Sequence, residues 1–370
     1  MTVDRLGFYE FFAGGGLARL GLGQRWTCLL ANDICAKKAA AYRGNFGTSP
    51  ELVVDDIRRL SCAHLPSGAA LAWASFPCQD LSLAGNGRGL AGERSGTFLP
   101  FWTLIDGLAR RGRPVPVVVI ENVVGALSSN GGADFRLLFE IITGSGYYGG
   151  ALVMDAIHFV PQSRPRLFIV AVHESCGTPA GGQISETWHS PRLRAAYSRL
   201  PGTLRRRWIW WTLPHPPPRN SSLSDILERG APWHSSGETD RILSLMSERH
   251  LAKIHAALAS GRPQIGAVYK RIRVENGRRV QRAEVRFDGV SGCLRTPAGG
   301  SSRQIIIRVE GGQVRTRLLT PREAARLMGV PDSYCLPARY NEAYHLMGDG
   351  VVVPAVAWLE RFLLRRLALR

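Results

Sequence analysis

Residues 6–17 of the chain read LGFYEFFAGGGL, an apolar run that passes directly into glycines. The run suits a buried strand, and the LARLGLG that follows is helix-like. Glycines between a strand and a helix let the backbone approach a ligand closely at the carboxyl edge of a sheet. The segment is neither a phosphate loop with Gly-Lys-Ser/Thr nor a strict GxGxxG motif. Alone, it predicts either a ligand-binding loop or a tight structural turn.

Short apolar runs alternate with helix-like stretches from residue 6 to about 172. The runs are LGFYEFF, CLLAN, LVV, ALAWASF, VPVVVIE, ALVMDA and RLFIVAV. They lack a regular polar–apolar alternation, which is typical of parallel strands covered on both faces. We therefore predict an α/β fold with a Rossmann-like, doubly wound, mostly parallel sheet over 1–173. The last two strands are close in sequence and are expected as a hairpin at the sheet edge.

The composition and periodicity of the chain change after residue 174. The stretch HSPRLRAAYSRLPGTLRRRWIWWTLPHPPPRNSS is rich in Pro, Arg and Trp and has no sustained period. It predicts a second, smaller, irregular basic domain over 174–344, with its tryptophans packed in that domain's core rather than stacked on bases. LTPREAARLMG predicts a helix capped by Thr320 and Glu323 with Pro321 in its first turn. Residues 345–370 are expected as a C-terminal helix that returns to the first domain.

The charge of the chain indicates a polyanionic partner. The net charge is +18, and residues 175–295 hold 18 Arg and 2 Lys against 9 Asp and Glu. Such an excess favours nucleic acid. The seven cysteines form no CxxC pair, so neither a disulfide framework nor a metal site is expected. No long apolar segment and no signal-peptide pattern occurs, so we expect a cytoplasmic protein without a membrane partner.

Acidic residues follow the second and third predicted strands. Asp33 could accept both hydroxyls of a ribose, and Asp56 could accept from an adenine amino group. Each acid taken singly is more typical of a helix cap. Together with the glycine loop on the neighbouring strand, they predict a nucleoside site.

Three further motifs lie at later strand ends. In SFPCQDLSLAG, Cys78 follows the fourth strand; a lone cysteine is usually a core residue, but a long glycine-rich segment suited to closing over a substrate follows. Glu121 ends the apolar run of the fifth strand, where a carboxyl needs a partner or a proton. In QSRPR, alternation would send Arg164 and Arg166 to one face, able to pair with Glu121 or with phosphate.

The motifs FFAGGG, FPCQDLS, ENV and QSRPR, in this order and spacing, resemble those of the carbon-5 cytosine DNA methyltransferases. The resemblance continues through RLLTPREAARLMGVPDSY and YHLMGDGVVVPAV, so it covers nearly the whole chain apart from about 175–290. It implies S-adenosylmethionine as cofactor, duplex DNA as partner and no metal. The implied reaction is site-specific methyl transfer to carbon-5 of a flipped-out cytosine, through a cysteine adduct at carbon-6.

The resemblance carries residue roles over to the matching positions. Cys78 would be the nucleophile, Glu121 the partner of the cytosine edge, and Arg166, with Arg164 in support, the contact to the base carbonyl or phosphate. The cofactor would meet Phe12, Ala13, Gly14, Gly16, Leu17, Asp33, Ile34, Asp56, Ile57, Pro77, Phe98 and Asp349. The substrate would meet Gln79, Ser82 and Gln162.

Two positions depart from the family pattern. Glu10 stands where the family usually has Asp, and Asp349 stands where it usually has Asn. Asp349 would lie either near the cationic methionine part of the cofactor or in a structural turn, so the departure bears on cofactor affinity.

Two rival functions remain at this point. One is methylation of cytosine in transfer RNA, and the other is a catalytically silent DNA-binding protein. The basic segment favours DNA and a target-reading role, while the combination of Cys78, Glu121 and Arg166 favours an enzyme. The expected protein is a monomer of the bacterial cytoplasm or nucleoid, compatible with a cognate restriction endonuclease as partner.

Overall fold

The computed structural model describes residues 5–76, 97–296 and 303–369. The chain forms two compact units. The first comprises the described residues of 1–154, 165–215 and 353–370, and the second comprises those of 155–164 and 216–352. Within the described residues, no helix has the length and apolarity needed to cross a membrane.

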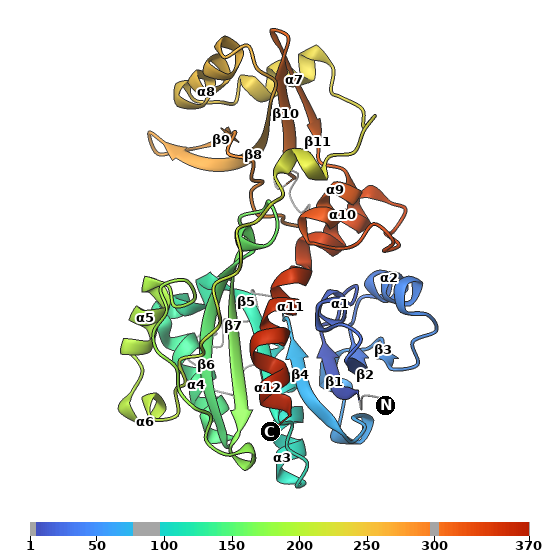
Figure 1. Cartoon of the computed structure of the whole chain (residues 1–370), viewed down its shortest axis with the longest axis vertical. Coiled ribbons are helices and arrows are strands. Elements are labelled where there is room, and N and C mark those ends of the chain that lie inside the picture. Colours follow the sequence, from blue (N-terminus) through green and yellow to red (C-terminus); the bar gives the residue numbers. More distant parts are fainter. Residues whose placement is uncertain (1–4, 77–96, 297–302, 370) are drawn as a thin grey trace. The chain divides into compact units, whose positions relative to one another are not determined.

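The first unit is built on a mostly parallel sheet (Figure 1). Within the described residues, its strand order is β3-β2-β1-β4-β5-β7-β6. The strands are β1 (Leu6–Phe11), β2 (Trp26–Asn32), β3 (Leu52–Val53), β4 (Ala69–Ala74), β5 (Val117–Val123), β6 (Tyr147–Asp155) and β7 (Pro165–His173). Strands β1 to β5 pair in parallel, and β7 runs antiparallel to β5. This confirms the predicted doubly wound fold, with β6 and β7 at one edge.

Helices flank this sheet on both faces (Figure 1). They are α1 (Leu17–Leu22), α2 (Ala36–Phe46), α3 (Phe98–Arg110), α4 (Ala133–Gly144), α5 (Pro191–Ser198) and α6 (Gly202–Arg205). Successive side chains of β1 point to opposite faces. Phe11 meets Phe101 of α3 with ring centroids 5.1 Å apart, while Phe8 meets Trp26 at 6.3 Å. Each such aromatic ring, fully buried, contributes about 1.5–3 kcal/mol to folding.

The boundary predicted at 173/174 is wrong, because the Trp-rich segment belongs to the first unit. Ile209 donates its amide to the carbonyl of Gly149 on β6, and Trp211 donates its indole N–H to the carbonyl of Val170 on β7. Trp208 is 7% exposed and lies in the same hydrophobic core as β1 and α4. The tryptophans are therefore core residues, as favoured from the sequence, but they lie in the first unit.

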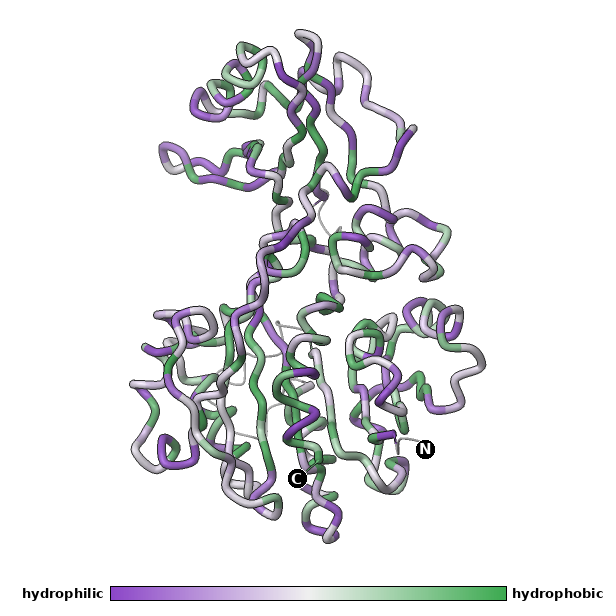
Figure 2. Tube along the Cα trace, viewed as in Figure 1, coloured by the Kyte–Doolittle hydropathy of each residue, from purple (hydrophilic) through white to green (hydrophobic). Residues whose placement is uncertain are grey.

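The second unit has an antiparallel sheet with the order β11-β10-β8-β9. Its strands are β8 (Gln264–Glu275), β9 (Arg278–Arg286), β10 (Ile305–Glu310) and β11 (Gln313–Leu318), and its helices are α7 (Ser236–Leu243), α8 (Glu248–Ala259), α9 (Pro321–Leu327) and α10 (Tyr340–Asp349). Ile242 of α7 and Ile254 of α8 pack against Val268 and Ile305. Figure 2 shows hydrophobic residues along these strands. The unit is thus more regular than the Pro-rich sequence at its start predicts.

Two local predictions near the C-terminus can be compared with the structure. Thr320 and Glu323 form the predicted capping box at the start of α9, with Pro321 in the first turn. The final helical stretch begins at Val353, not at 345. It runs through α11 (Val353–Leu359), a π-helical turn (Glu360–Leu364) and α12 (Arg365–Ala368), and α11 packs against α1 of the first unit.

Candidate functional site

The glycine loop after β1 is shaped by two left-handed residues. Gly14 has φ +58° and Gly16 has φ +75°. A Cβ at Gly16 would lie 2.3 Å from the Phe46 ring, so this position admits only glycine without movement. A Cβ at Gly14 would meet no described atom within 4 Å. The loop is therefore packed on one side at Gly16 and opens onto space at Gly14.

Asp33 holds the glycine loop and begins the next connection. Its Oδ2 accepts from the amide of Gly14 at 2.8 Å, and its Oδ1 accepts from the amide of Cys35 at 2.8 Å. The residue is 7% exposed, so the carboxylate is fixed at the strand ends. The neighbouring Ile34 is 68% exposed, although an isoleucine is usually buried. A carboxylate and an exposed apolar side chain thus stand together beside the open loop.

The residues expected around an adenine divide into two groups. Asp56 caps the short turn Ile57–Arg59 and pairs with Arg58, whose side-chain hydrogen bond holds the pKa of this carboxyl at about 2. The capping role that single acids often have therefore holds for Asp56. Ile57 is 4% exposed and Phe98 is 0% exposed, and both lie in the hydrophobic core. Their side chains are thus covered by protein in this structure.

Phe12, Ala13 and Leu17 complete the loop. Phe12 has φ +57°, a backbone conformation that is uncommon outside glycine, and its ring meets that of Phe76 at 6.2 Å. Ala13 is 7% exposed and Leu17 is 3% exposed, so both face the protein interior. Strained backbone of this kind often occurs at ligand sites.

Glu10 lies beneath the loop and is 1% exposed. Its Oε1 accepts from the amide of Arg19 at 3.2 Å, near the start of α1. Burial raises the pKa of this carboxyl to about 8, against the lowering effect of the Arg19 amide and charge. Glu10 is therefore protonated over much of the range in which a free glutamate is charged.

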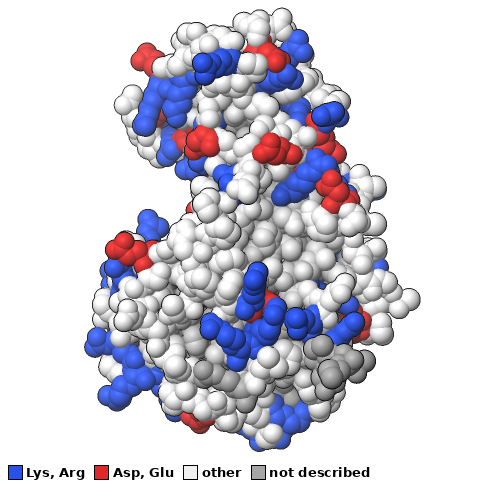
Figure 3. Space-filling model, viewed as in Figure 1, with Lys and Arg blue, Asp and Glu red and all other residues white. Residues whose placement is uncertain are grey.

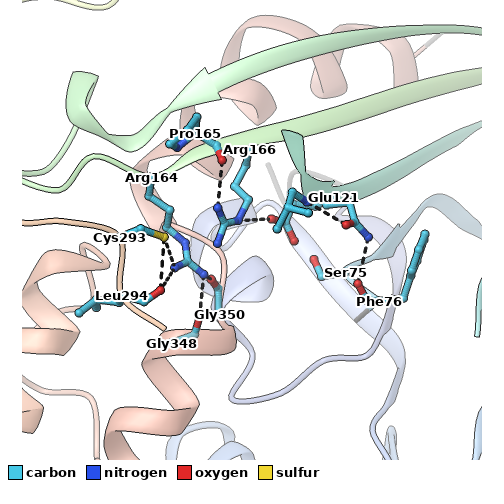
Figure 4. A network of polar contacts seen from close by, with 12 residues as sticks. Ser75, Phe76, Glu121, Arg164, Pro165, Arg166, Cys293, Leu294, Gly348 and Gly350 are labelled. Atoms are coloured by element: carbon cyan, nitrogen blue, oxygen red, sulfur yellow. Dashed lines mark hydrogen bonds and ion pairs between the residues drawn. The ribbon is translucent and has the colours of Figure 1, made fainter. Parts of the chain in front are cut away.

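Glu121 and Arg166 form an ion pair at the ends of β5 and β7. The Arg166 Nε lies 3.3 Å from the Glu121 Oε1, and the two side chains are 15% and 8% exposed (Figure 4). In the β5–β7 register, Arg166 lies opposite Val123, two residues from Glu121. The arginine is the partner that a buried carboxylate requires. The pair is nearly desolvated, so hydrogen bonds that it makes are stronger than in water.

Asn122 is a residue whose role the sequence did not reveal. It is 5% exposed, and its amide donates to the carbonyl of Phe76 at 3.1 Å while its Oδ1 accepts from the amide of Val123 at 2.8 Å. It thereby ties the end of β5 to the chain after β4. The available signal was its place in ENV, directly after the strand-end acid.

Four predicted site residues lie outside the described residues. They are Pro77, Cys78, Gln79 and Ser82. Phe76, which Asn122 holds, is the last described residue before them in the chain.

Gln162 and Arg164 do not have the surroundings expected for contacts with substrate. Gln162 is 0% exposed; its Nε2 donates to the carbonyl of Leu327 at 2.8 Å, and its Oε1 accepts from the amide of Leu294 at 2.9 Å. Both ends of the amide are thus used by backbone of the second unit. A substrate contact for Gln162 stays a prediction beside these structural contacts.

Arg164 is likewise 2% exposed. Its guanidinium donates to the carbonyls of Leu294 at 2.7 Å, Gly348 at 2.8 Å and Gly350 at 2.9 Å (Figure 4). The predicted alternation fails because Arg164 precedes β7, which begins at Pro165. Arg164 therefore holds three carbonyls of the second unit together, and the supporting role expected for it beside Arg166 stays a prediction.

Asp349 ends α10 between two of the residues that Arg164 contacts. Its Oδ2 lies 3.3 Å from the Nδ1 of His345, one helical turn earlier. Of the two expectations for this carboxylate, the structure shows the local one, an interaction at a helix end. A contact with the cofactor stays a prediction.

Comparison with known proteins identifies relatives along almost the whole chain. The family model for C-5 cytosine-specific DNA methylase matches residues 6–363. The type II methyltransferase M.BsuFI of Bacillus subtilis is 26% identical over 97% of this chain and 74% of its own length. M.HhaI of Haemophilus parahaemolyticus is 24% identical over 96% of this chain and 93% of its own length.

Solved structures with a similar fold also cover the chain. The Entamoeba histolytica methyltransferase EhMeth superposes with a TM-score of 0.63 at 17% identity, covering 98% of this chain and 99% of that one. The Dnmt2 methyltransferase of S. pombe superposes with a TM-score of 0.60 at 18% identity, covering 98% and 99%. At these identities, the likeness concerns the fold.

Proposed function

Because the chain belongs to the C-5 cytosine-specific DNA methylase family, we propose that the strand-end site of the first unit transfers a methyl group to cytosine through a covalent adduct with Cys78. Membership makes the protein an S-adenosylmethionine-dependent DNA (cytosine-5) methyltransferase. The mechanism and the residue roles are our proposal. The observation that supports them most is the buried Glu121–Arg166 pair.

The loop and its neighbours fit S-adenosylmethionine. The space beside Gly14 admits a ligand close to the backbone, the Asp33 carboxylate offers acceptors for ribose hydroxyls, and the exposed Ile34 offers an apolar surface for adenine. When bound, this cofactor supplies an electrophilic methyl group on a sulfonium. Asp56, Ile57, Phe98 and Asp349 would contribute less directly, since each has a partner or a cover within its own unit.

The ion pair fits the edge of a cytosine. That edge presents, in order, the carbonyl oxygen, ring nitrogen 3 and the exocyclic amine. Arg166 can donate to the carbonyl while Glu121 interacts with nitrogen 3 and the amine, because the two side chains already lie side by side at 3.3 Å. The base must leave the duplex to reach such a buried pair, so base flipping is part of the proposal.

The chemistry requires a nucleophile and a group that stabilises the hydrogen-bonding edge of the cytosine. The Cys78 thiolate adds to carbon-6, which makes carbon-5 nucleophilic. A proton shared between Glu121 and ring nitrogen 3, together with the Arg166 guanidinium at the carbonyl, offsets the negative charge that develops on the ring. Carbon-5 would then take the methyl group, as the bond between that methyl and the sulfonium sulfur breaks and a neutral thioether leaves. Solvent water then takes the carbon-5 proton, and the electron pair of that bond expels the Cys78 sulfur from carbon-6 as a thiolate. Asn122 would position the chain that leads to Cys78 through its hydrogen bond to Phe76.

The nucleophile is tested by labelling and trapping. The protein is incubated with tritiated S-adenosylmethionine and duplex DNA, and separately with a duplex that contains 5-fluorocytosine, from which the adduct cannot be released. Cys78→Ser should abolish both labelling and the covalent complex. Cys335→Ser, which changes an exposed thiol of the second unit, should retain both. Full labelling by Cys78→Ser would contradict the assignment.

The substrate and partners are tested in the same assay. Duplex DNA should accept label and transfer RNA should not, since the family acts on DNA. We also propose a monomer acting in the bacterial cytoplasm, with a cognate restriction endonuclease as partner. Sedimentation of the purified protein and a search of the adjacent genes for an endonuclease check these two points.

A further inference from the structure

We propose that the two-stranded end of the β8–β9 hairpin is the element that enters the major groove of the DNA and reads its sequence. This rests on the proposed function, because it names the part of the chain that selects the DNA substrate. The hairpin belongs wholly to the second unit. It extends away from the rest of that unit's sheet (Figure 1).

The hairpin changes character along its length. β10 pairs with β8 only from Gln264 to Val268, whereas β8 and β9 stay paired as far as Glu275 and Arg278. Beyond Val268 the sheet is therefore a ribbon of two strands. The seven residues of each strand beyond this point, 269–275 and 278–284, span about 20 Å. A two-stranded ribbon fits the major groove, which is about 12 Å wide and about 8.5 Å deep.

The tip of the ribbon is built for a tight reversal. Asn276 has φ +50° and Gly277 has φ +75°, the left-handed pair that an Asn-Gly hairpin turn requires. Such a turn keeps the two strands in register, so side chains near the tip have fixed neighbours. A rigid tip loses little conformational freedom on binding.

The two faces of the ribbon differ in how their polar groups are used. On one face, Arg273 pairs with Glu284 and Arg282 pairs with Glu275. These arginines are already engaged by carboxylates of the same hairpin. The guanidinium groups of these two arginines are therefore held by carboxylates, while Arg278 of the same face has no such pair among the described residues.

The opposite face holds uncommitted groups. In the register, Ile272 lies opposite Gln281, and Val274 lies opposite Arg279. Within the described part of the chain, neither Gln281 nor Arg279 makes a side-chain hydrogen bond or ion pair. Ile272 is 47% exposed and Val274 is 72% exposed. Nearer the helices, the same face of the hairpin is buried, because Val268 and Val285 lie in the core of the second unit.

This combination matches the chemistry of base edges in the major groove. Arg donates to the two acceptors of guanine, Gln pairs with the acceptor and amino group of adenine, and aliphatic side chains contact the thymine methyl group. The ribbon beyond Val268, residues 269–284, also carries six Lys and Arg against two Glu. Figure 3 shows basic residues gathered at the upper left, over the hairpin.

A second copy of the chain is the alternative occupant, because β9 is an edge strand of its sheet. Edge strands pair with other chains when they are apolar, and charged residues prevent this. β9 carries Arg278, Arg279, Arg282 and Arg286. The excess of arginine over the single glutamate of this edge strand disfavours strand pairing between copies and favours a polyanion.

The test compares two neighbouring arginines that point to opposite faces. Bisulfite sequencing of DNA from cells that express the wild-type protein first gives the methylated motif. We then compare Arg279→Ala with Arg278→Ala, since both residues are exposed and each change removes one charge. Arg279→Ala should relax one position of the motif and weaken binding to the cognate duplex by about 5- to 150-fold. Arg278→Ala should keep the motif and only reduce the salt dependence of binding.

Each other outcome has a definite meaning. If the wild type methylates its motif and Arg279→Ala, Gln281→Ala and Ile272→Ser all keep that motif and the affinity, the hairpin proposal is overturned while the methyltransferase function stands. If the wild type methylates no cytosine, the proposed function fails and this inference fails with it. If sedimentation shows a dimer that Val274→Lys dissociates, the ribbon is an interface between copies and the proposal is also overturned.

Discussion

The two glycines that flank Gly15 should respond very differently to the same substitution. In Gly16→Ala, the new Cβ would lie 2.3 Å from the Phe46 ring and 2.9 Å from the Tyr42 ring, and the backbone would keep φ +75°. The left-handed backbone costs about 1–2 kcal/mol for a residue with a Cβ. Overpacking against the rings adds about 1–3 kcal/mol. We therefore expect Gly16→Ala to lower the free energy of unfolding by about 2–5 kcal/mol.

Gly14→Ala is the matched control. Its φ of +58° carries the same backbone cost, but its Cβ would meet no described atom within 4 Å, so the loss should stay near 1–2 kcal/mol. Because that Cβ occupies the space proposed for the cofactor, Gly14→Ala should instead weaken S-adenosylmethionine binding. Urea denaturation followed by tryptophan fluorescence measures the first effect, and isothermal titration calorimetry the second. A Gly16→Ala protein as stable as Gly14→Ala would refute the packing argument.

Three further substitutions test buried polar groups. Arg317→Met should cost about 3–5 kcal/mol in urea denaturation, because it leaves the Glu323 carboxylate, 0% exposed, without its arginine; adding Glu323→Gln should recover part of this loss. For Glu10, the folded pKa of about 8 exceeds the unfolded value of 4.5, so wild-type stability should fall by at most about 1.4 kcal/mol per pH unit as pH rises through that interval. In Glu10→Gln this slope should be absent; an unchanged slope assigns it to other groups. Asn122→Ala should cost about 1–3 kcal/mol by leaving the Phe76 carbonyl unpaired, and equal stability would show that this bond is replaced.

Local patterns in the sequence predicted the strand ends well. Apolar runs fix where strands lie, and parallel strands bring their carboxyl ends to one edge, so the glycine loop, Asp33 and Glu121 could be placed together beforehand. The capping residues of α9 were also predictable, because a capping box involves only neighbours in the chain.

Assignments that depend on distant partners were less successful. Arg164 and Arg166 are separated by one residue, yet one is buried among carbonyls of the second unit and the other pairs with Glu121. Nothing in the sequence around Gln162 indicated that both ends of its side-chain amide would form hydrogen bonds with backbone groups. The Trp-rich segment has the composition of the basic region, but its indoles complete the core beside β6 and β7.

The sequence by itself determined the order of strands and helices, the chemical groups at the strand ends and the family, since each depends on residue type and spacing along the chain. Only the tertiary structure decided which arginine meets the strand-end glutamate, where the two units divide and which arginines of the β8–β9 ribbon pair with carboxylates. These depend on contacts between residues far apart in the chain, and such contacts are set by packing and by the need to pair every buried charge.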